Sequence, residues 1–196
     1  MSGARRVGVL AAQGGFDAHA RALAAVGVSA REVRAPRDLD GLDGLVLPGG
    51  ESGAQLVAMS RDGLEEPLRA LLAADLPVLG TCAGLILLAA RVLVRAGEPA
   101  TQRSFGALDV EVTRNAWGRQ VSSFRAPLEG AGAAGAGWGE ALFIRAPRLT
   151  ALGAVEVVAW ARGEPVAARS GRCWGLTCHP ELVGNPRFHE AVFCGG

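Results

Sequence analysis

The 196-residue sequence contains no lysine, so all twenty of its basic residues are arginine. Together with the abundance of alanine and glycine, this indicates a compositional bias of the coding sequence rather than a function. The absence still excludes one class of site. A Walker-type phosphate-binding loop requires a lysine that reaches the phosphates, and this chain has none.

Cysteine and long hydrophobic runs are also scarce. The four cysteines, Cys82, Cys173, Cys178 and Cys194, are irregularly spaced, which favours a reduced protein in the cytoplasm over a disulfide-stabilised one. No segment approaches the roughly 20 apolar residues that a membrane span needs. The apolar run at residues 7–12 is too short for a signal sequence and is followed by a pair of glycines.

Charge of one sign is not in excess either. The net charge is +1 and the basic residues are scattered, so the sequence does not predict a nucleic-acid-binding surface. A chain of this length is expected to form one domain, residues 1–196. Its core is then large enough to need neither a disulfide nor a metal for stability.

The first half of the chain alternates between strand-like and helix-like patterns. We expect helices at 16–27, 64–75 and 83–93, and strands at 5–12, 29–36, 43–50 and 76–81. This alternation predicts an α/β fold in which helices cover both faces of a parallel sheet. Active sites in such sheets lie at the carboxyl ends of the strands.

The second half is richer in short strands. Residues 105–124 predict two strands around a hairpin-like turn at 115–118, and 128–140 predict a Gly/Ala-rich surface loop. Further strands are expected at 141–147, 154–161, 164–171 and 172–182, followed by a short helix within 185–196.

One cysteine stands at the tightest point between an expected strand and an expected helix. Cys82 lies in "GTCAG", with Gly80 and Gly84 on either side, the form of a nucleophile elbow. The turn strains the backbone of the nucleophile and leaves no room for side chains beside it. The helix N-terminus offers free N–H groups that stabilise a thiolate, and the Ala83 N–H faces a carbonyl oxygen under attack. The alternative is a buried structural cysteine.

A cysteine nucleophile needs a base, and the chain has three histidines. We expect His19 to be a solvated residue of the first helix and His189 a surface residue of the last. His179 begins "HPE" at the end of a strand. In an extended chain residues two apart point to the same side, so Glu181 can orient the imidazole as the third member of a triad. The alternative is a simple turn after a strand.

The loop "PGGES" follows another buried strand. It lacks the lysine of a phosphate-binding loop, so we interpret it as a flexible loop whose backbone N–H near Gly50 completes an oxyanion hole with Ala83. Glu51 and Ser52 are then placed to contact a polar, zwitterionic substrate.

These motifs, in this order, resemble the class I glutamine amidotransferases, the Cys-His-Glu glutaminases. The stretches "DVEVTRNAWGRQVSSF", "FIRAP" and "GVLAAQGGFDAHARAL" narrow the resemblance to the Pdx2/SNO family, the glutaminase subunits of pyridoxal 5'-phosphate synthase. The resemblance covers nearly the whole chain. It implies a three-layer, flavodoxin-like α/β fold with a mixed central sheet.

The resemblance also implies a chemistry. Cys82 attacks the side-chain amide of L-glutamine to form a γ-glutamyl thioester, and His179 carries the protons. The family's substrate positions match Gly50, Glu51 and Ser52 in the loop, with Arg114 in "TRNAWG" and Ile144 and Arg145 in "FIRAP". An arginine suits a carboxylate because its planar fork binds both oxygens.

The partner that the family implies is a (β/α)₈ synthase subunit in a large hetero-oligomer for vitamin B6 synthesis. Ammonia passes to this partner, and docking completes the oxyanion hole, with the segment around Gln13 and Gly14 responding to it. Neither a cofactor nor a metal is expected. Cys173, Cys178, His179 and Cys194 are the alternative metal ligands, but Cys-x₄-Cys-His lacks the paired spacing of a structural zinc site.

Three departures from the family pattern bear on partner affinity. Gly53 and Ala54 follow "PGGES" where threonine is usual and make that loop more mobile. The Gly/Ala-rich segment 130–139 is long, and the C-terminus after "VF" is short. Two further functions stay open: a glutaminase subunit of another amidotransferase, and an inactive regulatory module of the same fold.

Overall fold

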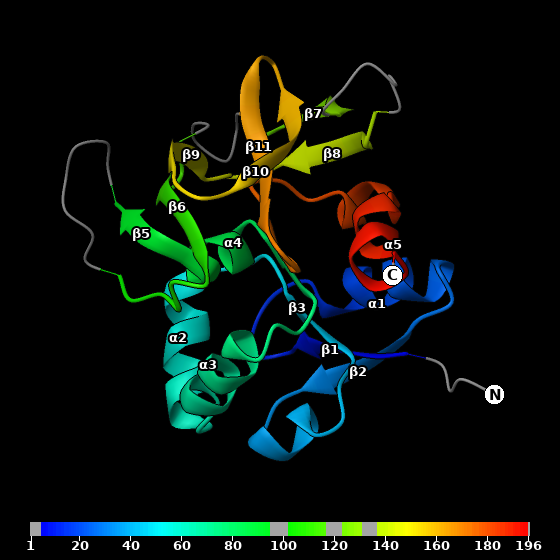
Figure 1. Ribbon diagram of the computed structural model, residues 1–196, viewed down its shortest axis with the longest axis vertical. Coiled ribbons are helices and arrows are strands. Elements are labelled where there is room, and N and C mark those ends of the chain that lie inside the picture. Colours follow the sequence, from blue (N-terminus) through cyan, green and yellow to red (C-terminus); the bar gives the residue numbers. More distant parts are fainter. Residues whose placement is uncertain (1–4, 95–101, 117–122, 131–136, 196) are drawn as a thin grey trace.

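The computed structural model describes residues 5–94, 102–116, 123–130 and 137–195. A nine-stranded sheet runs through the molecule, and a three-stranded sheet lies beside it (Figure 1). The large sheet has the order β2 (Ser29–Val33), β1 (Arg6–Leu10), β3 (Gly44–Leu47), β4 (Val78–Thr81), β12 (Cys173–Leu176), β11 (Glu164–Ser170), β10 (Glu156–Ala161), β7 (Phe124–Gly130), β8 (Gly139–Phe143). The small sheet has the order β5 (Ala89–Leu93), β6 (Leu108–Thr113), β9 (Arg148–Leu152).

The large sheet is mixed, as the family resemblance implied. Strands β2, β1, β3, β4 and β12 are parallel. The alternating strand–helix pattern of the first half predicted β1 to β4, but not that β12 joins them. From β12 onward each neighbour is antiparallel, through β11, β10, β7 and β8. The expected hairpin between β6 and β7 is wrong, because β6 pairs with β5 and β9 whereas β7 pairs with β8 and β10. Of the turn predicted at 115–118, Asn115 and Ala116 lie in a turn, whereas 117 and 118 lie outside the described residues.

Helices cover both faces of the parallel half (Figure 1). They are α1 (Phe16–Ala25), α2 (Ser52–Arg61), α3 (Glu65–Ala73), α4 (Ala83–Leu88) and α5 (Arg187–Phe193), with 3₁₀ turns η1 (Pro36–Leu39) and η3 (Glu181–Val183). Alternate residues of β3 divide the core: Val46 packs in the cluster that contains α1 and α5 residues, whereas Leu45 and Leu47 pack in the cluster with α2, α3 and α4 residues. This period of two produces the expected three layers.

Two local expectations are corrected. The helix expected over 83–93 ends at Leu88, and Ala89–Leu93 forms β5 against β6. The error arose because residues 83–89 are buried on every side, so apolar periodicity does not separate a helix from a strand there. Gly53 and Ala54 lie in the first turn of α2, not in a mobile loop. Of the Gly/Ala-rich segment, 131–136 lie outside the described residues.

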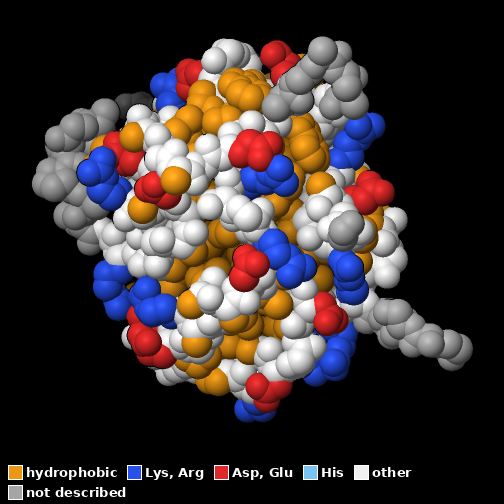
Figure 2. All heavy atoms as spheres, viewed as in Figure 1, with side chains coloured by type: hydrophobic (Ala, Val, Ile, Leu, Met, Phe, Trp, Pro, Cys, Tyr) orange, Lys and Arg blue, Asp and Glu red, His pale blue; other side chains and the backbone are white. Residues whose placement is uncertain are grey.

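Within the described residues, no helix is long and apolar enough to cross a membrane. The visible face intersperses arginines with acidic side chains and shows no histidine (Figure 2). Correspondingly, all three histidines are buried, with relative exposures of 0% for His19, 8% for His179 and 0% for His189.

Candidate active site

The turn between β4 and α4 presents the thiol of Cys82. The residue has φ 49° and ψ −100°, a conformation that side chains other than glycine rarely adopt. A methyl group on Gly84 would collide with the carbonyl oxygen of Leu47, and one on Gly80 would collide with the Gly84 backbone. Gly84 therefore lets the turn at Cys82 pack directly against β3, and Gly80 lets α4 pack closely on β4. The positive φ of Cys82 confirms the strained turn that the sequence predicted.

His179 and Glu181 are joined by a hydrogen bond of 2.7 Å between Nδ1 and Oε1. The contact was predicted, but the reason offered for it was wrong. Pro180 has φ −66° and ψ −32°, and Glu181 begins the 3₁₀ turn η3, so the chain bends here and is not extended. His179 itself is fixed by two backbone hydrogen bonds with Leu142 of β8, its N–H donating at 2.8 Å and its carbonyl accepting at 3.2 Å.

The electrostatics of this pair favour an imidazolium beside a carboxylate. Burial by itself lowers the pKa of His179, but its interactions with Cys82 and Glu181 outweigh burial and raise that pKa to about 10. Burial by itself raises the pKa of Glu181. Its interactions with His19 and His179, including the hydrogen bond from His179, together with a backbone hydrogen bond, hold its pKa at about 2. A protonated His179 is thus stabilised between a carboxylate and a thiol.

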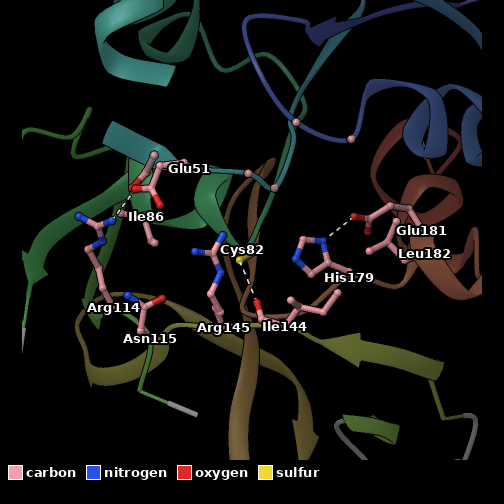
Figure 3. Close-up of a pocket in the computed structure, with 15 residues that line it drawn as sticks. Glu51, Cys82, Ile86, Arg114, Asn115, Ile144, Arg145, His179, Glu181 and Leu182 are labelled. Carbon is pink, nitrogen blue, oxygen red and sulfur yellow. Dashed lines mark hydrogen bonds and ion pairs between the residues drawn. The ribbon is translucent and has the colours of Figure 1, made fainter. Parts of the chain in front are cut away.

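Cys82 and His179 face each other at the floor of a cavity of about 230 Å³ (Figure 3). Of the predicted substrate and oxyanion residues, Gly50, Glu51, Ser52, Arg114, Ile144 and Arg145 line this cavity, whereas Ala83 does not. The sequence did not predict the further lining residues Gly14, Gly15, Gly49, Ile86, Asn115 and Leu182. Most of these are neighbours of predicted residues along the chain, which is the signal that could have identified them.

An ion pair closes one side of the cavity. An Nη atom of Arg114 donates to Oε1 of Glu51 at 2.6 Å, and the other donates to Oε1 of Gln102 at 2.7 Å. Ser52 Oγ also donates to that Gln102 oxygen, at 3.1 Å. The pair places one positive and one negative group about a cavity of amino-acid size. Gln102 had no distinguishing pattern in the sequence and was missed.

The loop that carries Gly49 and Gly50 is held by two glutamines. The side-chain oxygen of Gln13 accepts the Glu51 N–H at 2.8 Å. Gln55 Nε2 donates to the carbonyl oxygens of Gln13 (2.9 Å) and Pro48 (3.1 Å). The segment before α1 therefore contacts the loop expected to contribute to the oxyanion hole.

The expectation that His19 and His189 lie at the surface is wrong. His19 Nδ1 lies 2.9 Å from His189 Nε2, while His19 Nε2 lies 3.1 Å from Thr81 Oγ1 and 3.5 Å from Glu181 Oε1. Both histidines fall on apolar faces, since α1 also buries Leu23, four residues after His19, and α5 also buries Val192 and Phe193, three and four residues after His189. Helical periodicity could have indicated burial, but not these partners.

The four cysteines are free thiols. In the described part of the chain, no group of three or more histidine, cysteine or acidic side chains is arranged to hold a metal ion. Burial raises the pKa of Cys173 to about 12 and that of Cys178 well above its usual value, so both thiols are poor ligands at neutral pH.

Comparison with known proteins gives a consistent result. Residues 9–194 match the SNO glutamine amidotransferase family. A pyridoxal 5'-phosphate synthase subunit PdxT from Corynebacterium jeikeium is 46% identical over 192 residues, covering 94% of this chain and 93% of that protein. The PdxT subunit from Frankia casuarinae is 49% identical over 191 residues, covering 97% and 94%.

A solved structure described as a glutamine amidotransferase is 40% identical and superimposes with a TM-score of 0.84, covering 97% of this chain and 99% of that one. PurLQS from Thermotoga maritima has a TM-score of 0.69 at 18% identity, covering 98% and 99%, and so shares the fold.

Proposed function

The chain belongs to the SNO glutamine amidotransferase family, and we propose that it hydrolyses L-glutamine at Cys82 as the glutaminase subunit of pyridoxal 5'-phosphate synthase. The observation that supports this most is the placement of a strained, glycine-flanked thiol beside an imidazole that a buried carboxylate holds at 2.7 Å. The curated relatives named PdxT, 46% and 49% identical over most of the chain, support the assignment to vitamin B6 synthesis.

In the proposed reaction, the Cys82 thiolate attacks the side-chain amide carbon of glutamine and forms a tetrahedral intermediate. His179 donates a proton to the amide nitrogen as the C–N bond breaks, which releases ammonia and leaves a γ-glutamyl thioester. Water then loses a proton to His179 and attacks the thioester. Cleavage of the C–S bond releases glutamate and restores the thiolate, while Glu181 stabilises the imidazolium throughout.

The negative oxygen of each intermediate needs hydrogen-bond donors. We assign this role to the backbone N–H groups of Ala83, next to the nucleophile, and Gly50, in the loop at the cavity edge. Gly50 has φ 154°, and a methyl group there would press against the Gln13 side chain. This supports a loop whose conformation depends on glycine.

The α-amino and α-carboxylate groups of glutamine are the proposed partners of Glu51 and Arg114. An Nη atom of Arg114 and Oε1 of Glu51 lie 2.6 Å apart at the cavity. A zwitterion that inserts between these two side chains provides each with a group of opposite charge. Ser52, Ile144 and Arg145 complete the proposed substrate contacts. Arg145, at φ 44°, holds an unusual backbone conformation of the kind that clusters at functional sites.

The proposed partner is a (β/α)₈ synthase subunit in a hetero-oligomer, which consumes the ammonia. Residues 48–52 form the loop to which we assign part of the oxyanion hole, called the oxyanion loop below. The Gln13 side chain already contacts this loop by accepting the Glu51 N–H. Docking near Gln13 and Gly14 can therefore change the conformation of the oxyanion loop through this contact. The free thiols support a reducing compartment, the cytoplasm.

The test is glutamate release from glutamine by the purified chain, alone and with its cognate synthase subunit. We expect slow release alone and a marked increase with the partner. Cys82→Ala is the matched control, because it removes the sulfur and leaves docking intact. Release by Cys82→Ala at the wild-type rate, or no release by the wild-type complex, would contradict the proposal.

A further inference from the structure

A buried polar cluster lies behind the proposed triad, on the side away from the cavity. It consists of His19 from α1, His189 from α5 and Thr81 from β4, and is called the histidine cluster below. Its contacts form a chain from His189 to His19 at 2.9 Å and from His19 to Thr81 at 3.1 Å. His19 Nε2 also lies 3.5 Å from Glu181 Oε1. The proposed triad has not used any of these three side chains.

The hydrogen-bond partners assign the protons of the cluster. His189 Nδ1 is buried and has no hydrogen-bond partner among the described residues. A buried N–H without an acceptor costs more free energy than a buried nitrogen that carries no proton. We therefore leave His189 Nδ1 unprotonated and place the proton on His189 Nε2. His189 Nε2 then donates to His19 Nδ1, which leaves His19 Nε2–H to donate toward Thr81 Oγ1 and to face the Glu181 carboxylate.

Glu181 has few other contacts to hold it. Its side chain is buried, Oε1 accepts from His179 Nδ1 at 2.7 Å, and Oε2 has no hydrogen-bond partner in the described part of the chain. The backbone N–H of Glu181 also favours the charged carboxylate, but a buried carboxylate with one short side-chain hydrogen bond can still rotate unless a second side chain restrains it. Among the described basic side chains, two have a nitrogen within 4 Å of a Glu181 carboxylate oxygen, namely His179 at 2.7 Å and His19 at 3.5 Å.

We propose that His19 is a positioning residue for the reaction: held in one tautomer by His189, it fixes the Glu181 carboxylate and thereby the orientation of His179 toward Cys82. This inference rests on the proposed function of Cys82, His179 and Glu181. His19 touches neither the substrate cavity nor the thiol, so its effect passes through Glu181.

The cluster also reaches the two other parts of the site. Thr81 immediately precedes Cys82, and its hydroxyl oxygen accepts the Gly49 N–H of the oxyanion loop at 3.1 Å. His19 lies in the first half of α1, which follows the segment that contains Gln13. A single imidazole is therefore in contact, directly or through Thr81, with the triad carboxylate, the nucleophile strand and the oxyanion loop.

His19 acts here as a neutral donor. Burial lowers the pKa of His19 despite the opposing effect of Glu181, and burial lowers that of His189 to about 3. The groups that face His19 are Glu181 from η3, His189 from α5 and Thr81 from β4, with the charge of His179 nearby. The cluster thus adds orientation without a second positive charge.

Two substitutions of similar size separate positioning from space-filling. The amide of His19→Gln reaches the Nε2 position and keeps a donor toward Thr81 and Glu181. The shorter amide of His19→Asn reaches only the Nδ1 position, toward His189. With the synthase present, we expect His19→Gln to keep kcat within about threefold of wild type. His19→Asn should lower kcat by about tenfold to hundredfold, the effect of a misplaced catalytic group, with KM changed less than about threefold. Equal kcat values for the two variants, or the reverse order, would overturn the proposal.

A second measurement does not depend on glutamine. The rate of Cys82 alkylation by iodoacetamide is followed against pH, with the Cys82 peptide identified by mass spectrometry because exposed Cys194 also reacts. We expect the pH midpoint to rise by about one unit in His19→Asn and to stay unchanged in His19→Gln, because a misoriented His179 stabilises the thiolate less. Unchanged midpoints in both variants would count against positioning. The wild-type complex could release no glutamate while the pH midpoint of Cys82 alkylation still rises in His19→Asn. In that case the proposed glutaminase function is wrong, but the positioning of His179 by His19 is supported.

If near-ultraviolet circular dichroism shows that His19→Asn does not fold, the same comparison is made at His189, the neighbouring histidine of the cluster. His189→Gln keeps the donor to His19, whereas His189→Asn removes it. We expect wild-type kcat for the first and a decrease of about threefold to tenfold for the second. Indistinguishable kcat values for this pair would overturn the role of the cluster.

Discussion

Gly49 and His179, 130 positions apart in the chain, are in such close contact that a methyl group on Gly49 would collide with the imidazole ring. The oxyanion loop thus forms one wall against which the proposed catalytic base rests. Since Gly49 N–H also donates to Thr81, the loop is tied to the nucleophile strand at the same residue. The base and the loop therefore cannot be placed independently of each other.

Gly49→Ala is expected to displace His179 and to lower kcat by about a hundredfold, because a shift of about 1 Å in a catalytic group costs that much. The control is Gly53→Ala in α2, where the nearest atom to the added methyl group is a Glu51 oxygen at 3.8 Å. This control should retain activity and unfold at an equal or higher urea concentration, because alanine is favoured over glycine in a helix. Steady-state kinetics and urea unfolding measure both; full activity of Gly49→Ala would contradict the packing argument.

The strain at Cys82 is testable through stability. Cys82→Gly and Cys82→Ala both remove the sulfur and should release no glutamate. At φ 49°, glycine avoids a penalty of about 1 kcal/mol that alanine keeps, offset in part by the flexibility of glycine in the unfolded chain. We expect the glycine variant to be the more stable of the two in chemical denaturation. A more stable alanine variant would mean that the turn is not strained.

Removing Arg114 should affect substrate binding more than chemistry. Arg114→Ala is expected to raise the KM for glutamine at least tenfold, because one charge-assisted hydrogen-bond partner is worth about 1.5–3 kcal/mol, while kcat changes less. Arg103→Ala is the matched control, since its ion pair with Glu65 is exposed on the arginine side and Arg103 does not line the cavity. Equal KM values for the two variants would show that Arg114 does not contribute to glutamine binding.

Because the buried His19 and His189 resist protonation, the protein should have a lower free energy of unfolding in mild acid than at neutral pH. His189 has a folded-state pKa of about 3 against an ordinary 6.5, so the unfolded chain binds a proton as pH falls below 6.5 while the folded chain does not. This contribution is complete above pH 6.5 and is lost as pH falls toward 3. At 1.36 kcal/mol per pKa unit, it amounts to about 2 kcal/mol between pH 6.5 and 5.

His189→Gln is the comparison for this effect, because its amide contacts His19 but does not titrate. The free energy of unfolding should fall less steeply between pH 6.5 and 5 in this variant than in the wild type, as measured by urea unfolding at each pH. The contribution of His179 to stability changes with pH in the opposite direction. Because its pKa is raised, this contribution is fully present below pH 6.5 and is lost as pH rises through about 10. Parallel curves for the two proteins below pH 6.5 would show that His189 is not buried as a neutral group.

Short-range patterns were sufficient for much of the fold and the core of the site. The alternating strand–helix pattern predicted the parallel strands β1 to β4, because each element buries one face against the next. The glycines around Cys82 predicted the turn, because a side chain at Gly84 would collide with Leu47 of β3 and one at Gly80 would collide with α4. Where the chain is buried on all sides, as in residues 83–89, the same reasoning did not find the end of the helix at Leu88.

By itself, the sequence determined what short-range spacing controls: the glycine-flanked turn at Cys82, the contact between His179 and Glu181, and the family to which these motifs belong. Only the tertiary structure decided how distant polar groups pair. It bends Pro180 into a 3₁₀ turn, packs Gly49 against His179, and joins His19 to His189 and Glu181 in the interior. The physical reason is that a buried polar group must find a partner wherever the packed helices and strands supply one, and no pattern along the chain specifies which distant residue that is.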